Sequence, residues 1–165
     1  ASQLHFYDCT YFSFDKCCLP KSAVIPLHNH PGMTLFCNIL IGNVHLISYD
    51  WAKSAPYNDS NALENSDGAR LANANTDDVF DASMDTTFQY PENGGNLHCF
   101  TAMTSCAVLD VTGPPYNHAD GPHCSYYDES PFLNSSEAHA LYSWLKDIHS
   151  TFHIKVIMMP QRFIV

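Results

Sequence analysis

Two histidines that lie two positions apart could bind one metal ion. His28 and His30 occur between Pro26 and Pro31, and proline disfavours a helix in the residue before it, so the chain is expected to be extended here. Side chains two positions apart in an extended chain point to the same face. Such a pair arises by chance roughly 0.6 times in a chain with this histidine content, so the spacing alone is weak evidence.

A third histidine, His98, is the candidate that would complete a metal site. It lies in the strand-like run Leu97–Ala102, directly after a turn that contains Gly94 and Gly95, and glycine allows a close approach of the backbone. Hairpins of a β-barrel readily bring such a strand beside the first pair. The chain resembles the two motifs of cupin barrels in part, because it keeps their histidines and glycines at His28, His30, Gly42, Gly95 and His98.

The metal-binding glutamate of the cupin motif is missing, and this decides which chemistry the three imidazoles could support. Thr34 or Leu35 stands in its place. Two histidines and a carboxylate are the usual ligands of non-haem Fe(II), whereas three neutral imidazoles favour an anionic co-ligand such as a thiolate, which forms when a thiol binds a divalent metal. Zinc with three histidines and a water would instead make a hydrolase or hydratase. A 2-oxoglutarate oxygenase is disfavoured, since arginine commonly holds its co-substrate and the chain has only Arg70 and Arg162.

The elements that would position these histidines are short β-strands. Gly42-Asn43 predicts a β-hairpin between two apolar runs. Many short strands favour an all-β fold, and we predict a small cupin-type antiparallel β-barrel, a double-stranded β-helix or jelly roll, with room for a metal in its mouth. The strand-like runs are Leu4–Tyr7, Tyr11–Leu19, Ala23–Leu27, Met33–Ile41, Val44–Tyr49, Thr86–Tyr90, Leu97–Ala102 and Cys106–Val111.

A C-terminal helix is predicted in addition. Asn134 and Glu137 resemble a capping box, and apolar residues then follow at the helical spacing. These residues are Ala138, Leu141, Leu145 and Ile148. A last alternating run over residues 152–158 returns to the strand period.

The chain is strongly acidic. Seventeen acidic and seven basic side chains give its 165 residues a formal charge of −10, which repels nucleic acid and anionic lipid. No apolar run approaches the roughly 20 residues of a membrane-spanning helix. We predict one domain over residues 1–165 that works as a monomer, without a nucleic-acid or membrane partner. Half of the charge lies in an Asn- and Asp-rich stretch at about 52–85, which we interpret as a polar acidic insertion.

The seven cysteines are odd in number and show no C-x-x-C spacing. This argues against a disulfide framework and against a structural zinc knuckle, and most of them are expected to be buried thiols in a reducing compartment. The first ten residues lack the charged-then-apolar pattern of a secretion signal. We therefore expect a cytoplasmic protein, with the nucleus as an open second location.

Two blocks of the chain resemble a known enzyme family. They are closely similar to the plant cysteine oxidases and, more distantly, to the animal 2-aminoethanethiol (cysteamine) dioxygenases. Together they cover just under half of the chain in the right order. The blocks are CCLPKSAVIPLHNHPGMTLFCNILIGNVHLISYDW, Cys17–Trp51, and GGNLHCFTAMTSCAVLDVTGPPYNHADGPHCSYYDESPF, Gly94–Phe132.

The resemblance implies an Fe(II)-dependent thiol dioxygenase that inserts both atoms of O₂ into the sulfur of an N-terminal cysteine, giving cysteine sulfinic acid. In this family the product feeds the N-degron pathway, so the enzyme senses oxygen in the hypoxia response. The implied partners are N-terminal Cys peptides or proteins, among them the N-termini of transcription factors. His28, His30 and His98 match the ligands of the family's single iron.

Three further residues match functional positions of the family. Asp110, in Leu-Asp-Val, matches an acidic residue near the iron, and we expect it to receive the α-amino group of the substrate or a proton during turnover. Tyr116 and Cys124 match positions that line the pocket, and in the animal relative such a pair can become covalently linked. Two alternatives stay open: a dioxygenase for cysteamine or another small thiol, and a non-catalytic cupin that binds a ligand.

Overall fold

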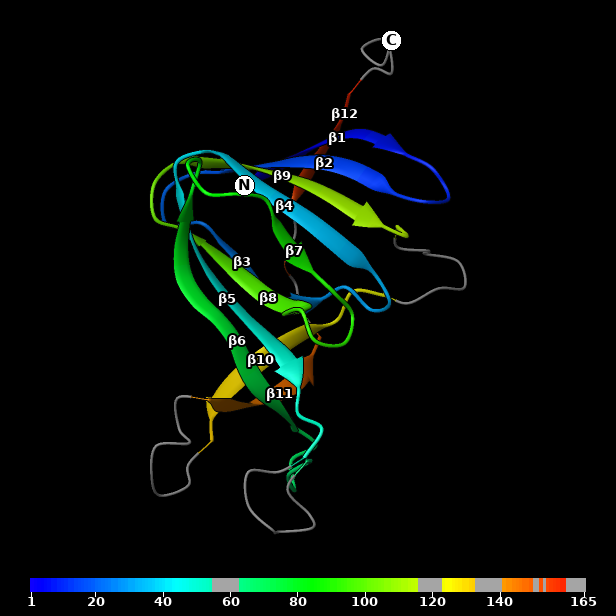
Figure 1. The fold of residues 1–165 in the computed structure, drawn as a ribbon, viewed down its shortest axis with the longest axis vertical. Helices are drawn as coiled ribbons and strands as arrows, with labels where there is room; N and C mark the ends of the chain where they lie inside the picture. The colour runs from blue at the N-terminus through cyan, green and yellow to red at the C-terminus, as the bar shows by residue number, and fades with distance from the viewer. Residues whose placement is uncertain (55–62, 116–122, 133–140, 150–151, 153, 160–165) are drawn as a thin grey trace.

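The computed structural model describes residues 1–54, 63–115, 123–132, 141–149, 152 and 154–159, and in these residues every regular element is a β-strand (Figure 1). No helix among them is long and apolar enough to cross a membrane. The twelve strands are β1 (Ser2–Asp8), β2 (Ser13–Leu19), β3 (Val24–Asn29), β4 (Thr34–Ile41), β5 (Asn43–Trp51), β6 (Arg70–Asp81), β7 (Thr87–Gln89), β8 (Leu97–Ala102), β9 (Cys106–Gly113), β10 (Tyr126–Pro131), β11 (Tyr142–Ile148) and β12 (Lys155–Met158).

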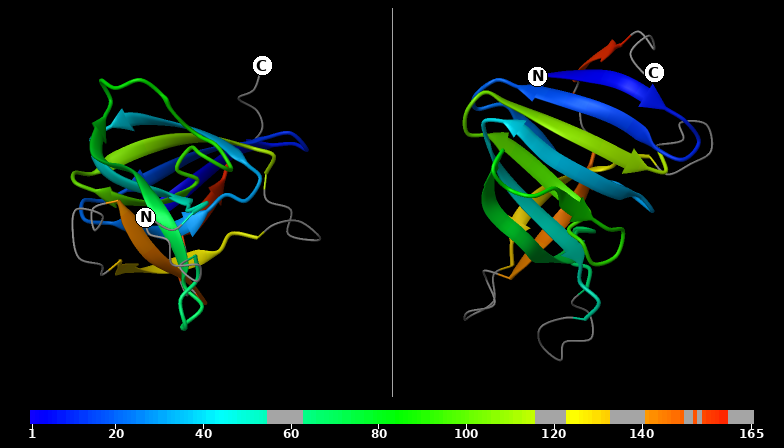
Figure 2. Two further views of the ribbon diagram at one scale, coloured as in Figure 1. Left: turned by 60° about the horizontal axis from the view of Figure 1, so that its bottom comes forward. Right: turned by 45° about the horizontal axis from the view of Figure 1, so that its top comes forward.

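The strands form two layers, which confirms the predicted all-β, cupin-type class. One six-stranded sheet has the order β12-β1-β2-β9-β4-β7, and the second group closes in the order β10-β11-β6-β5-β8-β3. Apart from the parallel pair of β1 and β12, the pairings are antiparallel. Figure 2 shows β1, β2, β9 and β4 side by side in one layer, which lies over the second group of strands.

The main apolar core lies between these two layers. β2, β4 and β9 contribute side chains from one layer, and β5 and β8 contribute side chains from the other. Alternation explains this, because every second residue of each strand points toward the facing layer. The buried residues are Cys17, Leu19, Cys37, Ile39, Val44, Leu46, Phe100, Ala102, Cys106 and Val108.

The turn at Gly42-Asn43 is confirmed, but the hairpin is not. β4 ends at Ile41 and β5 begins at Asn43, yet β4 pairs with β7 and β9 while β5 pairs with β6 and β8. The turn therefore carries the chain from one layer to the other. Gly42 has a φ of +78° and a Cβ there would clash with the Ser105 carbonyl oxygen, so both conformation and space require glycine.

The predicted C-terminal helix is wrong for its second half, and its first residues, 133–140, lie outside the described residues. Tyr142–Ile148 form β11, which pairs with β10 and β6. Leu145 packs in the barrel interior and Trp144 points to the other face, against Phe132. Leu141 and Leu145 are four positions apart, a spacing that the strand period also allows, and pairing with two neighbours decided between the two structures.

We predict that Leu145→Ala lowers the free energy of unfolding by about 2–5 kcal/mol, the usual cost of removing a buried leucine side chain. Leu145 is 1% exposed and Leu141 is 57% exposed, so Leu141→Ala should change it by less than about 0.5 kcal/mol. Urea unfolding of both variants measures this difference. Equal costs for the two leucines would contradict the strand and restore the helical interpretation, in which both occupy one apolar face.

The acidic stretch is not a solvated insertion throughout. Residues 70–81 form β6, which pairs along β5 and with β11, so the interpretation is wrong for them. Leu71 and Ala72 are buried while Asp77 and Asp78 are exposed. The strand's backbone hydrogen bonds hold it in the sheet although its acidic side chains face solvent.

Candidate metal centre

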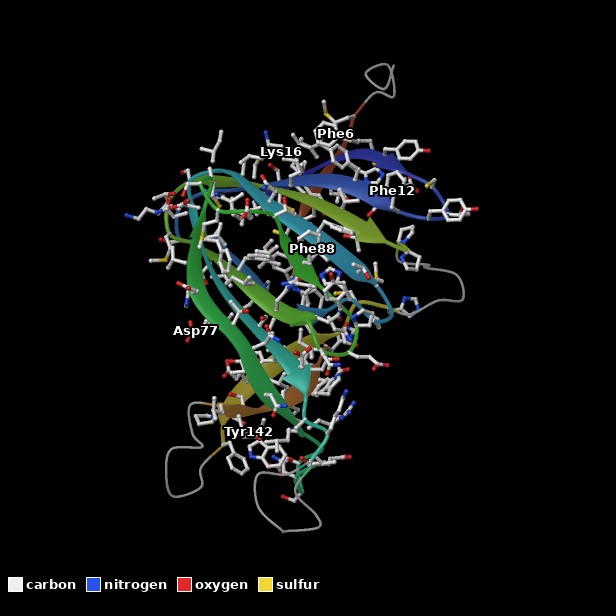
Figure 3. The ribbon with its side chains drawn as sticks, viewed as in Figure 1. Phe6, Phe12, Lys16, Asp77, Phe88 and Tyr142 are labelled. Atoms are coloured by element: carbon white, nitrogen blue, oxygen red, sulfur yellow. The ribbon has the colours of Figure 1, made fainter. Side chains whose placement is uncertain are left out.

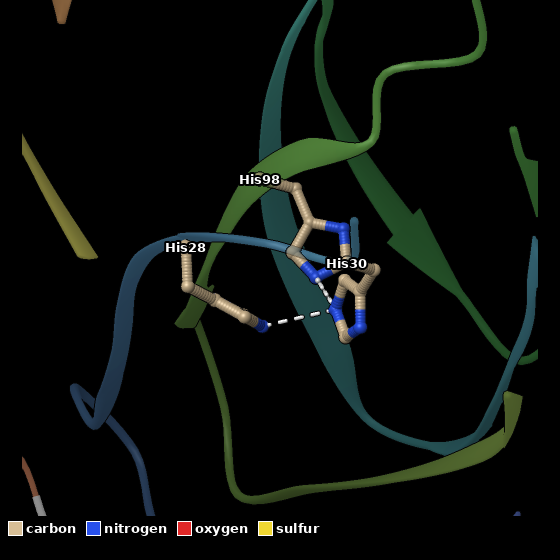
Figure 4. A group of neighbouring side chains, drawn as sticks. All are labelled: His28, His30 and His98. Carbon is tan, nitrogen blue, oxygen red and sulfur yellow. Dashed lines mark hydrogen bonds between the residues drawn. The ribbon is translucent and has the colours of Figure 1, made fainter. Parts of the chain in front are cut away.

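The structure brings the three predicted histidines together. His28 lies near the end of β3, His30 follows that strand, and His98 lies in β8 directly opposite His28 in the register of the two strands. The Nε2 atom of His30 is 3.1 Å from Nε2 of His28 and 3.1 Å from Nε2 of His98 (Figure 4). The three candidate ligand atoms all lie within 4.8 Å of one another.

Local hydrogen bonds hold the ring of His28 and the backbone of His30, whereas Nδ1 of His98 is buried without a hydrogen-bond partner among the described residues. Nδ1 of His28 lies 2.8 Å from the Pro26 carbonyl oxygen and donates to it, which leaves the lone pair of Nε2 free for a metal. The backbone N–H of His30 donates to Oδ1 of Asn96 at 3.0 Å, and Asn96 in turn donates to the Met33 carbonyl oxygen at 3.0 Å. Asn96 therefore ties the segment after β3 to the strand that carries His98.

The turn before His98 depends on a glycine. Gly95 has a φ of +68°, and a Cβ at this position would clash with the Ser48 hydroxyl. Its backbone N–H donates to Oδ1 of Asp50 at 2.9 Å. The turn is therefore anchored to β5, and the start of β8 is set beside β3.

The donor set fits a divalent metal. Metal–nitrogen bonds of about 2.1 Å that meet near a right angle place two nitrogens about 3 Å apart, close to the two observed separations of 3.1 Å. Burial lowers the pKa of all three histidines, so they are neutral at pH 7, the form that binds metals. Without metal, this costs stability in acid: below about pH 6.5 the unfolded chain takes up protons that the folded chain refuses.

A cavity of about 230 Å³ opens beside the three histidines, between the two layers. Leu35 lines it and is buried, so an apolar side chain occupies the neighbourhood where cupin motifs place a glutamate. Asp110 and Asp15 also line it, and the described lining residues include neither lysine nor arginine. The cavity thus combines three neutral candidate metal ligands with carboxylates that lie outside the histidine cluster.

Asp110 is the most perturbed of these carboxylates. Its Oδ1 atom is buried and has no hydrogen-bond partner among the residues that the structure describes. Burial raises its pKa to about 7, the negative charge of Asp15 acts in the same direction, and a hydrogen bond with the Cys37 thiol opposes them. At neutral pH this carboxylate can both accept and release a proton.

Of the other two predicted site residues, Cys124 is described by the structure and Tyr116 is not. Cys124 lines the cavity, where its thiol contacts the Ser125 carbonyl oxygen at 3.9 Å. Tyr116 lies outside the described residues, so its pairing with Cys124 stays a prediction. Sequence reasoning missed Tyr126, whose ring centroid is 6.0 Å from that of His28. Burial and the neighbouring Cys124 raise the pKa of Tyr126 to about 12, so its hydroxyl keeps its proton.

Sequence reasoning also missed Asp15. It lies in β2, two positions before the buried Cys17 and therefore on the same face of the strand. The alternation along β2 was the signal that could have placed Asp15 on the buried face. The cavity that Asp15 faces, however, is formed by strands distant in the sequence. Only the pairing of β2 with β9 shows that Asp15 lies opposite Asp110.

The chain is similar to known proteins of one family over most of its length. The profile of the PCO_ADO family matches residues 1–163. Plant cysteine oxidase 2 of Arabidopsis thaliana is 47% identical over 152 residues, which are 87% of this chain and 52% of that protein. Human 2-aminoethanethiol dioxygenase is 29% identical over 136 residues, 75% of this chain and 50% of that protein. The chain thus spans about half the length of these curated relatives.

Among solved structures, an RmlC-like cupin from Shewanella frigidimarina aligns with a TM-score of 0.46. The alignment has 16% sequence identity and covers 68% of this chain and 75% of that one.

Proposed function

The chain belongs to the PCO_ADO family, and on that basis we propose that it is an Fe(II)-dependent thiol dioxygenase that oxidises an N-terminal cysteine to cysteine sulfinic acid with O₂. The observation that carries the proposal is the cluster of His28, His30 and His98 in one cavity with Asp110, a carboxylate that is not part of the cluster. The overall reaction, RSH + O₂ → RSO₂H, adds two oxygen atoms to one sulfur and needs no further reductant.

The histidines of this chain supply the metal site, and other residues prepare the substrate. Bound iron(II) would supply the redox chemistry that joins both oxygens to the sulfur. Three neutral ligands leave the charge of a divalent ion uncompensated and so favour binding of the substrate as a thiolate. Asp110 lies in the same cavity and can take the thiol proton or hold the substrate's ammonium group. Ile25, Leu35 and Phe100 give the cavity apolar walls.

The charge of the cavity supports a substrate with a free amine. Its described lining carries Asp15 and Asp110 and no cationic side chain. A carboxylate close to the thiol, as in free cysteine, would meet these negative charges without a partner. In an N-terminal cysteine that carboxylate is converted to a peptide bond, which removes its charge.

Cysteamine is the second candidate substrate, because it also has an amine and no carboxylate. One relative is named a cysteine oxidase and the other a dioxygenase of 2-aminoethanethiol, which is cysteamine. A ligand-binding cupin without catalysis is the third candidate. A neutral, buried histidine cluster beside a carboxylate with a raised pKa favours catalysis over simple binding.

The test is an oxidation assay with four matched thiols. The iron-loaded protein should add two oxygen atoms in air to a peptide that begins with Cys, and a chelator should stop the reaction. The same peptide with an acetylated N-terminus and free cysteine should react at least 10-fold more slowly, and the rate with cysteamine decides between the two amine substrates. Mass spectrometry measures the products. If folded, iron-replete protein oxidised none of the four thiols, the proposed activity would be ruled out.

The cellular role that we propose follows from the family relationship. The sulfinic product would feed the N-degron pathway, with transcription-factor N-termini as substrates and O₂ as the sensed molecule. We propose that the protein acts as a monomer in the cytoplasm and the nucleus. All seven cysteines are free in the structure, which supports a reducing compartment.

A further inference from the structure

A row of polar side chains crosses the sheet that contains Asp110. His5 of β1 lies opposite Asp15 of β2, Asp15 lies opposite Asp110 of β9, and Asp110 lies opposite Cys37 of β4. Residues directly opposite on antiparallel strands share one face, with Cβ atoms about 4.5–5.5 Å apart. His5, Asp15 and Asp110 therefore form a continuous row, which we call the acidic row.

The inner end of the acidic row is in the cavity. Asp15 and Asp110 both line it together with the three histidines. Cys17 and Cys37 are the other titratable side chains that face Asp110 from β2 and β4, and burial raises the pKa of both thiols, so they stay neutral. The charge that Asp110 meets within its own sheet is therefore that of Asp15.

The outer end of the row reaches solvent through His5. Its Nδ1 atom is 2.8 Å from Oδ1 of Asp15, and its Nε2 atom is 3.1 Å from Oδ1 of Asp8. The side chains of His5 and Asp15 are 16% and 11% exposed, whereas that of Asp8 is 63% exposed. One imidazole thus links a carboxylate in the cavity to a carboxylate in solvent, and an imidazole can accept a proton on one nitrogen and release one from the other.

We propose that His5, Asp15 and Asp110 form a proton relay that carries the thiol proton of the substrate from the cavity to solvent. The proposal rests on the proposed function. At neutral pH the reaction is RSH + O₂ → RSO₂⁻ + H⁺, so one proton must leave for each substrate. It passes from sulfur to the Asp110 carboxylate, then directly or through one water to Asp15, its neighbour in the register of β2 and β9, and then to Nδ1 of His5, while Nε2 gives up its proton to Asp8 or water.

The effect of the two neighbours on His5 suits this role. Burial lowers its pKa, but the hydrogen bonds with Asp15 and Asp8 outweigh burial and raise the pKa above its usual value. His5 is therefore more than half protonated at pH 6.5, the usual pKa of a histidine. In this role His5 and Asp15 are positioning and relay residues, and Asp110 is the residue that meets the substrate.

A second histidine–aspartate pair provides a matched control. Nε2 of His45 in β5 is 2.6 Å from Oδ1 of Asp77 in β6. Neither residue lines the cavity. Figure 3 shows Asp77 on β6, away from β1 and β2. His45→Gln removes the same kind of ion pair without touching the acidic row.

The first test follows the protonation of Asp110 in metal-free protein, through the infrared carbonyl band of its protonated carboxyl group. Asp15→Asn removes the opposing negative charge and should shift the midpoint to lower pH. His5→Gln removes the group that neutralises Asp15 and should shift the midpoint to higher pH, while His45→Gln should leave it unchanged. Absence of both shifts in folded variants would show that the row is not coupled and would overturn the relay.

The second test measures oxidation of the Cys peptide by iron-loaded protein. His5→Gln and Asp15→Asn should each lower kcat about 10-fold, less than loss of a direct acid or base, with KM nearly unchanged and a larger solvent deuterium isotope effect. Asp15→Glu should recover most of the rate, and His45→Gln should match the unaltered protein. Normal kcat in both variants would overturn the relay alone, whereas an inactive unaltered protein would overturn the proposed function and the relay with it.

Discussion

Replacing His98 with alanine is expected to weaken Fe(II) binding more than roughly 100-fold and to abolish thiol oxidation. Loss of a partner that merely orients a ligand typically costs 10–100-fold in metal affinity, and His98 is a candidate ligand itself. Its Nε2 atom is 3.1 Å from that of His30 and the residue is 1% exposed, and among the described residues the cluster of candidate ligands contains only His28 and His30 besides it. Anaerobic metal titration measures the change in affinity directly.

The control for this variant is His45→Ala, which removes an imidazole from the neighbouring strand β5, outside the cavity. It should bind iron normally. Metal also stabilises the folded chain by about 2.7 kcal/mol at a free concentration 100-fold above Kd, and His98→Ala should lose this rise in Tm even if the alanine itself lowers stability. An undiminished metal-dependent rise in Tm would show that His98 is not a ligand.

The cluster of three candidate metal ligands could be predicted from the sequence because their arrangement is largely local. The two prolines keep residues 26–31 extended, which sets His28 and His30 on one face, and the glycine turn places His98 at the start of a strand. Their meeting then requires only that β3 and β8 pair, as they do with His28 opposite His98. The barrel class followed from the number and period of the strand-like runs.

The features that sequence reasoning missed depend on contacts between distant strands. β11 carries a helical apolar spacing, but its backbone pairs with β10 and β6 and Leu145 fills the barrel interior. β6 looks like a solvated acidic segment because its charges face outward. Asp15 gains significance only from its position opposite Asp110, and no local pattern contains that register.

Replacing Asp110 with asparagine is expected to lower kcat by roughly 10²–10³-fold, within the range of a lost general acid or base, and to leave metal affinity unchanged. Its pKa of about 7 means that the unaltered protein holds Asp110 increasingly as the carboxylate above pH 7, so the rate of the proposed thiol oxidation should rise with pH through that value. The amide side chain that Asp110→Asn introduces cannot ionise, and this step in the pH–rate profile should vanish.

The free energy of unfolding should rise in Asp110→Asn above neutral pH while kcat falls. The two measurements together separate a catalytic role of Asp110 from a structural one. A carboxyl group whose pKa is raised from 3.8 to about 7 on folding stabilises the fold below pH 3.8, and that contribution is lost as pH rises through 7. Asp110→Asn should therefore resist urea better than the unaltered protein at pH 8, and this advantage should shrink at pH 5 and vanish only below pH 3.8. A variant that is more stable and less active would identify Asp110 as a group kept for chemistry at the expense of stability. Lower stability at pH 8 would instead mean that the carboxylate holds the fold together.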